Sequence, residues 1–250
     1  SSSYPETAAK VLAAGMDVHT NFRKPELFVG ALRQAVADGL VSEELLDARV
    51  REVLTVKFRM GLFDNPYSGD VTLADKEAGA EHNMDFVHRT GEESIVLLKN
   101  DGILPLDKSA LRKVLVTGPL ATEVNFMSSR YGPNGLDAVC MLDGIREYLG
   151  SDVQVSYAKG CDVVDNKWPE SEIIPEPLTR QERADIEAAV KMAKKSDVVI
   201  AVMGEDEYRT GESRSRTSLD LPGRQRDLLV ALHATGKPVI LVLINGQPLT

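Results

Sequence analysis

A charged stretch between Gly204 and Pro222 combines carboxylates, guanidinium groups and a tyrosine. Its chemical groups are Glu205, Asp206, Glu207, Tyr208, Arg209, Glu212, Arg214 and Arg216. A carboxylic acid held near a tyrosine and partly removed from water has a raised pKa and can protonate a departing oxygen atom. Sugar chemistry would suit such a group, although composition alone favours a solvated surface loop and does not indicate which carboxylate would act.

The position of this stretch favours a functional loop. Four β-branched runs alternate with helical patterns, at residues 114–117, 153–157, 198–203 and 239–244. This rhythm predicts an open α/β sheet of parallel strands covered on both faces. Ligands of such sheets bind beyond the carboxyl ends of the strands. The charged stretch follows the third run, and a second candidate loop, Gly118 to Gly135, follows the first.

Residues 6–60 show helical patterns only. Pro25 opens one helix that Gly39 stops, and Ser42 caps another that ends at Gly61. Residues 62–82 are rich in Asp, Gly, Asn, Pro and Ser, which is typical of a linker, so we expect a domain boundary there.

The two ends of the sequence suggest that it is a fragment. The sequence starts without Met and stops just after the last β-branched run, with no helix to cover that strand. Because an exposed apolar strand is costly, we expect truncation at both ends.

Composition and missing motifs argue against several classes of protein. A formal net charge of -9 disfavours nucleic-acid binding, and no apolar run approaches a membrane span of about 20 residues. The sequence has no GxGxxG, GxxxxGK[ST] or GxSxG motif, and its four histidines lack metal spacing, so we expect neither a cofactor nor a metal. Cys140 and Cys161 match no metal or redox spacing and are expected to be core thiols.

Several motifs, in one order and spacing, together resemble a known family. They are Ala14-Gly-Met-Asp17, Val53 to Tyr67, Glu93 to Leu106, Val116-Thr-Gly-Pro119, Ser196 to Val199, Gly204-Glu205, Gly211 to Arg216, Leu221 to Gln225, Lys237-Pro-Val239 and Asn245-Gly246. Over essentially its whole length the chain resembles the family 3 glycoside hydrolases, particularly the bacterial periplasmic β-glucosidase branch.

The resemblance implies a (β/α)8 barrel followed by an α/β sandwich with a mainly parallel sheet. Residues 1–61 would be the C-terminal end of the barrel, 62–82 the linker, and 83–250 an incomplete sandwich domain. The family's aspartate nucleophile would lie upstream, in the missing barrel portion of the parent chain. We therefore expect a fragment that is inactive by itself.

The resemblance further implies a retaining, exo-acting β-glucosidase that acts on terminal β-D-glucosyl residues of oligosaccharides or β-glucosides. Glu212 matches the family's general acid/base, Glu205 would support its loop, and Arg216 would have a structural role. A periplasmic or secreted location is expected from the same resemblance. A β-xylosidase of this family and a non-catalytic carbohydrate-binding or interaction module are the alternatives.

Four further residues are candidates for substrate contacts. Arg130 and Tyr131 stand where many relatives have a tryptophan that stacks on the leaving-group sugar, and Tyr131 is able to stack similarly. Tyr208 and Arg214 flank Glu212 in the charged stretch, where Arg214 is also a candidate for holding Glu212 or the loop in shape.

Overall fold

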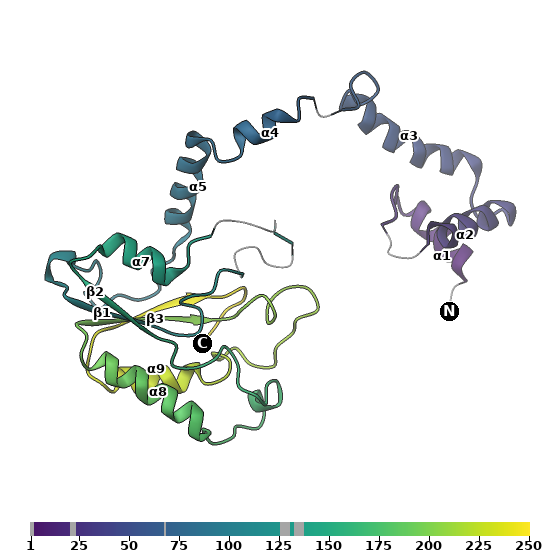
Figure 1. Cartoon of the computed structure of the whole chain (residues 1–250). Coiled ribbons are helices and arrows are strands. Elements are labelled where there is room, and N and C mark those ends of the chain that lie inside the picture. Colours follow the sequence, from purple (N-terminus) through teal and green to yellow (C-terminus); the bar gives the residue numbers. More distant parts are fainter. Residues whose placement is uncertain (1–2, 21–23, 68, 126–130, 133–137) are drawn as a thin grey trace. The chain divides into compact units, whose positions relative to one another are not determined.

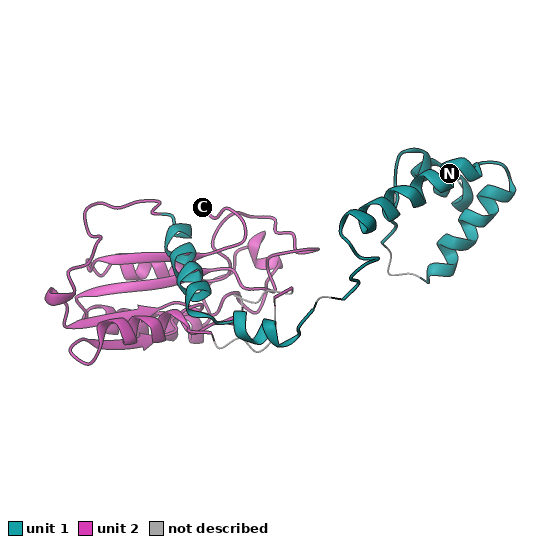
Figure 2. Ribbon diagram, turned by 90° about the horizontal axis from the view of Figure 1, so that it is seen from above, with its two compact units in different colours: residues 1–96 teal, residues 97–250 magenta. Residues whose placement is uncertain are grey.

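The computed structural model describes residues 3–20, 24–67, 69–125, 131–132 and 138–250. The chain forms two compact units, Ser1–Val96 and Leu97–Thr250, which Figure 2 shows in different colours. Within the described residues, no helix is both long and apolar enough to cross a membrane.

The described part of the first unit is helical. Its helices are α1 (Tyr4–Ala13), α2 (Pro25–Ala37), α3 (Glu43–Arg59), α4 (Thr72–Glu77) and α5 (Glu81–Ser94). Pro25 begins α2, and the Ser42 hydroxyl accepts a hydrogen bond of 3.2 Å from the backbone N–H of Leu45, as the sequence predicts. Leu12, Ala35 and Val41 form the buried core of the first three helices.

The region predicted to be a linker contains secondary structure of its own. Helix α4 and the first residues of α5 lie within 62–82, and neither helix buries a residue. Asp70 lies two residues before the first residue of α4, and its Oδ1 accepts hydrogen bonds from the N–H and hydroxyl of Thr72. The domain boundary at 62–82 stays a prediction.

The second unit is built on a parallel sheet. Its strands are β1 (Lys113–Thr117), β2 (Gln154–Ala158), β3 (Val198–Gly204) and β4 (Val239–Ile244), in the order β2-β1-β3-β4. All three neighbouring pairs are parallel, with Thr117 of β1 opposite Ala158 of β2 and Ala201 of β3. The four predicted strands are thereby confirmed within one or two residues.

Helices cover both faces of this sheet. They are α7 (Met141–Leu149), α8 (Arg180–Ala193) and α9 (Gln225–His233), with short 3-10 turns η1 (Lys108–Ala110) and η2 (Glu170–Glu172). Figure 1 shows α7 on one face and α8 and α9 together on the other. Val114 and Val116 pack in the core with Leu142 of α7, while Leu115 between them packs with Ile186 of α8. This alternation along β1 is that of a strand buried on both sides.

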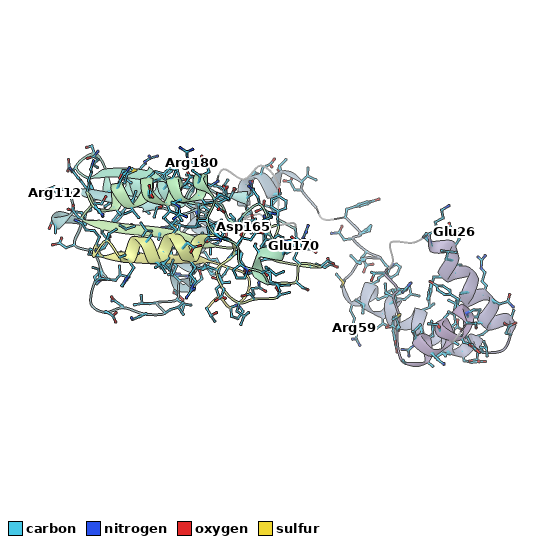
Figure 3. All side chains as sticks on the ribbon, turned by 90° about the horizontal axis from the view of Figure 1, so that it is seen from below. Glu26, Arg59, Arg112, Asp165, Glu170 and Arg180 are labelled. Atoms are coloured by element: carbon cyan, nitrogen blue, oxygen red, sulfur yellow. The ribbon has the colours of Figure 1, made fainter. Side chains whose placement is uncertain are left out.

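The winding direction changes between β1 and β3. The connection from β1 to β2 carries α7 on one face, whereas the connection from β3 to β4 carries α9 on the other. Ligand crevices of open α/β sheets lie at such a point, beyond the carboxyl ends of the strands. Figure 3 shows Arg112, before β1, and Asp165 and Glu170, after β2, at opposite ends of the sheet.

Glycines end the two strands at this crevice. Gly118 has φ 103° and Gly204 has φ 135°. A Cβ would lie 2.1 Å from the carbonyl oxygen of Val202 at Gly118, and 1.9 Å from that of Ile244 at Gly204. Only glycine fits where each chain turns away against its neighbour, so both loops leave the sheet at fixed points.

Candidate active site

Glu212 lies on a tight turn in the loop that follows β3. The backbone N–H of Arg214 donates to the carbonyl of Gly211 at 3.1 Å, and Ser213 has φ 61°. Among the described residues, Ser213 is the one non-glycine residue with positive φ. A left-handed serine costs about 1–2 kcal/mol, and such strain is found most often at functional sites. The turn presents the carboxylate of Glu212 at its outer corner.

Tyr131 meets Glu212 from the loop after β1. Its hydroxyl donates a hydrogen bond of 2.5 Å to Glu212 Oε2. The structure thus brings together two residues that the sequence assigns to the site from separate loops. Both side chains are exposed within this chain, so the expectation of a carboxylate partly removed from water is wrong for the structure described.

A buried ion cluster anchors the base of the same loop. The guanidinium of Arg216 lies between Glu205, at 2.7 Å from Nη1, and Glu172, at 2.6 Å from Nη2. The side chains of Arg216, Glu172 and Glu205 are 2%, 6% and 0% exposed. Burying one charge without its partner is strongly unfavourable, so the three groups hold one another in place. The ion pairs agree with the structural role expected for Arg216.

Hydrogen bonds favour the charged forms of Glu172 and Arg216. Burial alone would raise the pKa of Glu172, but hydrogen bonds from Arg216, Trp168 and Thr217 outweigh it and lower the pKa. Burial would likewise lower the pKa of Arg216, and its bonds to the two glutamates raise it. Gln247 Nε2 donates to Glu205 Oε1 at 2.7 Å, while Glu205 Oε2 is buried without a partner among the described residues.

The first part of the loop has a second anchor. Asp206 accepts a 2.6 Å bond from Arg209 and a 3.1 Å bond from the backbone N–H of Tyr208. The Arg209 guanidinium lies 5.2 Å from the ring centroid of Trp168 and 5.9 Å from that of Tyr208. Tyr208 is 60% exposed and lies four positions before Glu212 in the same loop.

The side chain of Gln225 forms hydrogen bonds with the backbone at the end of β3. Its fully buried side chain accepts from the N–H of Gly204 and donates to the carbonyl of the same residue, both at 2.8 Å. The amide also donates to the carbonyl of Val163 at 2.9 Å. One side chain therefore ties the start of α9 to the strand end and to the loop after β2.

Only some of the residues of this candidate site were predicted from the sequence. Arg214 is exposed at the end of the turn, and Arg130 lies outside the described residues. The sequence-based prediction of the site does not include three residues that support the loop, Trp168, Glu172 and Gln225. Trp168 is the one tryptophan of the chain, a weak signal on its own, and nothing near Glu172 in the sequence marks it as a partner of Arg216.

Other features lie apart from this loop cluster. A hollow of about 290 Å³ in the first unit and one of about 380 Å³ beside α7 are lined by other, mainly apolar residues. Within the part of the chain that the structure describes, no group of three or more His, Cys, Asp or Glu residues is placed to hold a metal ion.

The two cysteines are free and buried, which confirms the expectation of core thiols. Cys140 packs in the core under α7 and Cys161 in the core under α8 and α9, on opposite faces of the sheet. Burial raises the pKa of Cys161 to about 12.

Comparison with known proteins finds a matching family and several relatives. Residues 95–250 match the glycosyl hydrolase family 3 C-terminal domain. A periplasmic beta-glucosidase of Salmonella typhimurium is 36% identical over 98% of this chain and 33% of its own length. A beta-xylosidase of Formosa agariphila is 35% identical over the same shares.

Solved structures agree with these relatives. A beta-glucosidase involved in saponin metabolism from intestinal bacteria superposes with a TM-score of 0.85 at 30% identity, covering 100% of this chain and 36% of that one. The beta-glucosidase of Listeria innocua in complex with glucose gives 0.79 at 28% identity, covering 98% and 31%. The chain spans about a third of the length of these proteins.

Proposed function

Because the chain belongs to glycosyl hydrolase family 3, we propose that it supplies the general acid/base of a retaining β-glucosidase, and that Glu212 is this group. The observation that supports the proposal is the hydrogen bond from Tyr131, in the loop after β1, to Glu212, in the loop after the neighbouring strand β3. Retaining glycosidases need one carboxyl group to move protons and a second to attack, about 5–5.5 Å apart.

In the first step, the attacking aspartate forms a bond to the anomeric carbon while the bond to the glycosidic oxygen breaks. Glu212 gives its proton to that oxygen, so the aglycone leaves as a neutral alcohol and Glu212 becomes a carboxylate. In the second step, Glu212 takes a proton from water, the water oxygen attacks the anomeric carbon, and the bond to aspartate breaks. The sugar leaves with its configuration retained.

The nucleophile is proposed to come from outside this chain. Family resemblance places it in a barrel, and this chain spans 33% of the Salmonella typhimurium relative. Activity would then belong to a longer protein in which a barrel portion of the same parent chain meets the loops of Tyr131 and Glu212. In that protein the barrel would also remove Glu212 from water.

Terminal, non-reducing β-D-glucosyl residues of oligosaccharides or β-glucosides are the proposed substrates. Tyr131, which binds Glu212, and Tyr208 and Arg214, which lie near Glu212 in the sequence, are proposed to contact the sugar on the leaving-group side, together with Arg130. By analogy with the relative named as periplasmic, we propose that the protein acts in the periplasm or after secretion.

A β-xylosidase is the second candidate, because a relative of that name is 35% identical, close to the 36% of the β-glucosidase. Xylosides lack the hydroxymethyl group at C5 of glucosides. The ratio of kcat/KM for 4-nitrophenyl β-glucoside and β-xyloside, measured on the longer protein, decides between the two.

Glu212 variants of the longer protein test the proposed role. Glu212→Gln should lower kcat/KM on cellobiose by about 10²–10⁴-fold, the usual contribution of general acid–base catalysis, and leave 2,4-dinitrophenyl β-glucoside much less affected. Azide should restore turnover of the activated substrate by Glu212→Ala, with formation of a glycosyl azide. Unchanged rates in both variants would instead indicate a non-catalytic, sugar-binding module.

A further inference from the structure

We propose that Trp168 and Glu172, in the loop after β2, are positioning residues that hold Glu212 in place for proton transfer. We call this pair the brace. The inference rests on the proposed function of Glu212. The brace acts through the two sides of the loop that carries Glu212.

On the carboxyl-terminal side of the loop, the brace holds Arg216, four residues after Glu212. Glu172 Oε1 accepts from Arg216 Nε at 2.7 Å and lies 2.6 Å from Nη2. The other carboxylate oxygen accepts from the hydroxyl of Thr217 at 3.0 Å. Glu172 thus fixes two successive residues of the returning chain.

On the amino-terminal side, the brace holds Arg209, three residues before Glu212. The ring of Trp168 lies against its guanidinium, which is also bound to Asp206. The indole N–H of Trp168 donates to Glu172 Oε1 at 3.2 Å and joins the two halves of the brace. One short segment after β2 therefore holds both sides of the loop.

Glu205 by itself would not give the same restraint. It follows β3 directly and binds one edge of the Arg216 guanidinium through Nη1, whereas Glu172 binds the edge formed by Nε and Nη2. A planar guanidinium held on two edges cannot pivot. Without Glu172, Arg216 would keep its bond to Glu205 and the 2.8 Å bond from Nη2 to the carbonyl of Asp220, but it would lose the restraint at Nε. We infer that the turn that carries Glu212 would then shift.

Such a shift should weaken proton donation more than binding. A displacement of about 1 Å between reacting groups lowers rates by up to about 10²-fold. A substrate whose leaving group departs without a proton should be insensitive to the exact position of Glu212. The selective loss on poor leaving groups therefore distinguishes a positioning role from a general loss of folded protein.

The test is Glu172→Gln in the longer protein, with cellobiose and 2,4-dinitrophenyl β-glucoside as substrates. We expect kcat on cellobiose to fall by about tenfold, kcat on the activated glucoside to stay within about twofold, and both KM values to change little. Glu170→Gln is the matched control, because Glu170 is exposed on the same turn, and it should change neither rate.

A milder variant covers the case in which Glu172→Gln fails to fold. Trp168→Phe keeps an aromatic ring beside Arg209 and removes the N–H bonded to Glu172 together with part of the indole ring, so it should show the same selective loss to a smaller degree, about threefold. Equal losses on both substrates, or no loss on cellobiose, in the folded variant would overturn the brace.

Glu212→Gln, assayed beside these variants, separates the two proposals. If it shows the selective loss and the brace variants do not, the brace is refuted while the role of Glu212 stands. If Glu212→Gln itself shows no selective loss, the proposed function fails, and the positioning role fails with it.

Discussion

The hydroxyl of Tyr131 donates a 2.5 Å hydrogen bond to Glu212, joining residues that are 81 positions apart and follow different strands. We predict that this hydroxyl, more than the ring, matters for proton transfer. Tyr131→Phe in the longer protein should lower kcat on cellobiose by about three- to tenfold, since a typical hydrogen bond contributes about 0.5–1.5 kcal/mol. Tyr131→Ala should do the same and also raise KM. A Phe variant with wild-type kcat would point to stacking by the ring.

The chain of 250 residues is predicted to be inactive by itself. It would lack the proposed nucleophile and most of the sugar pocket, so no covalent intermediate should form. Release of 4-nitrophenol from its β-glucoside provides the measurement, with a complete family 3 β-glucosidase as the positive control. Turnover close to that of the complete enzyme would contradict the prediction.

Gly204→Ala should destabilise the second unit strongly. The new Cβ would lie 1.9 Å from the carbonyl oxygen of Ile244, at a φ that side chains rarely adopt. We expect a loss of at least about 2 kcal/mol in the free energy of unfolding, measured by urea denaturation. Gly144→Ala is the matched control: in the middle of α7 its Cβ meets only Val139 at an ordinary 3.7 Å, and it should stabilise by about 0.5–1 kcal/mol.

The two thiols should be unreactive in the folded chain. Cys140 and Cys161 are both buried, and burial raises the pKa of Cys161 to about 12, so little thiolate is present at neutral pH. Titration with Ellman's reagent at pH 7.5 should be slow, and should release two equivalents after unfolding in guanidinium chloride without a reductant. One or no equivalent after unfolding would show that the thiols are not free.

Asp197 makes the second unit sensitive to acid. Hydrogen bonds from the backbone N–H groups of Lys113 and Arg112 lower the pKa of its carboxyl group below that of the unfolded chain. The stabilisation is therefore present above about pH 4 and is lost as the pH falls through the lowered pKa. In Asp197→Asn, the free energy of unfolding should therefore fall less steeply as the pH is lowered. Asp152→Asn, at an exposed site, should leave this pH dependence unchanged.

Much of the fold follows from local patterns. The strands at 114–117, 198–203 and 239–244 were predictable because each is an apolar run rich in β-branched residues, and β1 and β3 are buried on both faces. Thr179 and Glu182 form the capping box that their spacing predicts, since capping depends on residues three apart. The short helix α4 was not predictable from the composition of its surroundings.

The candidate site was less predictable, because its contacts join distant parts of the chain. Glu172 and Arg216 are 44 residues apart, and Gln225 reaches Val163 across 62. No periodicity or cap connects such pairs, so only the folded sheet shows that the loop after β2 supports the loop after β3. The exposure of Glu212 differs from expectation for a related reason, because burial depends on what surrounds a turn and not on the turn's own residues.

The loop after β3 is fastened near both its ends, at Glu205 and at Arg216. The residues between these two fixed points carry no part of the sheet or of its two cores. Insertions or exchanges between these points, other than at Glu212, would therefore leave the scaffold intact while changing the surroundings of the proposed acid/base. Under the proposed function, such a division would let new glycoside preferences arise, in nature or in a designed library, without loss of the architecture that supports them.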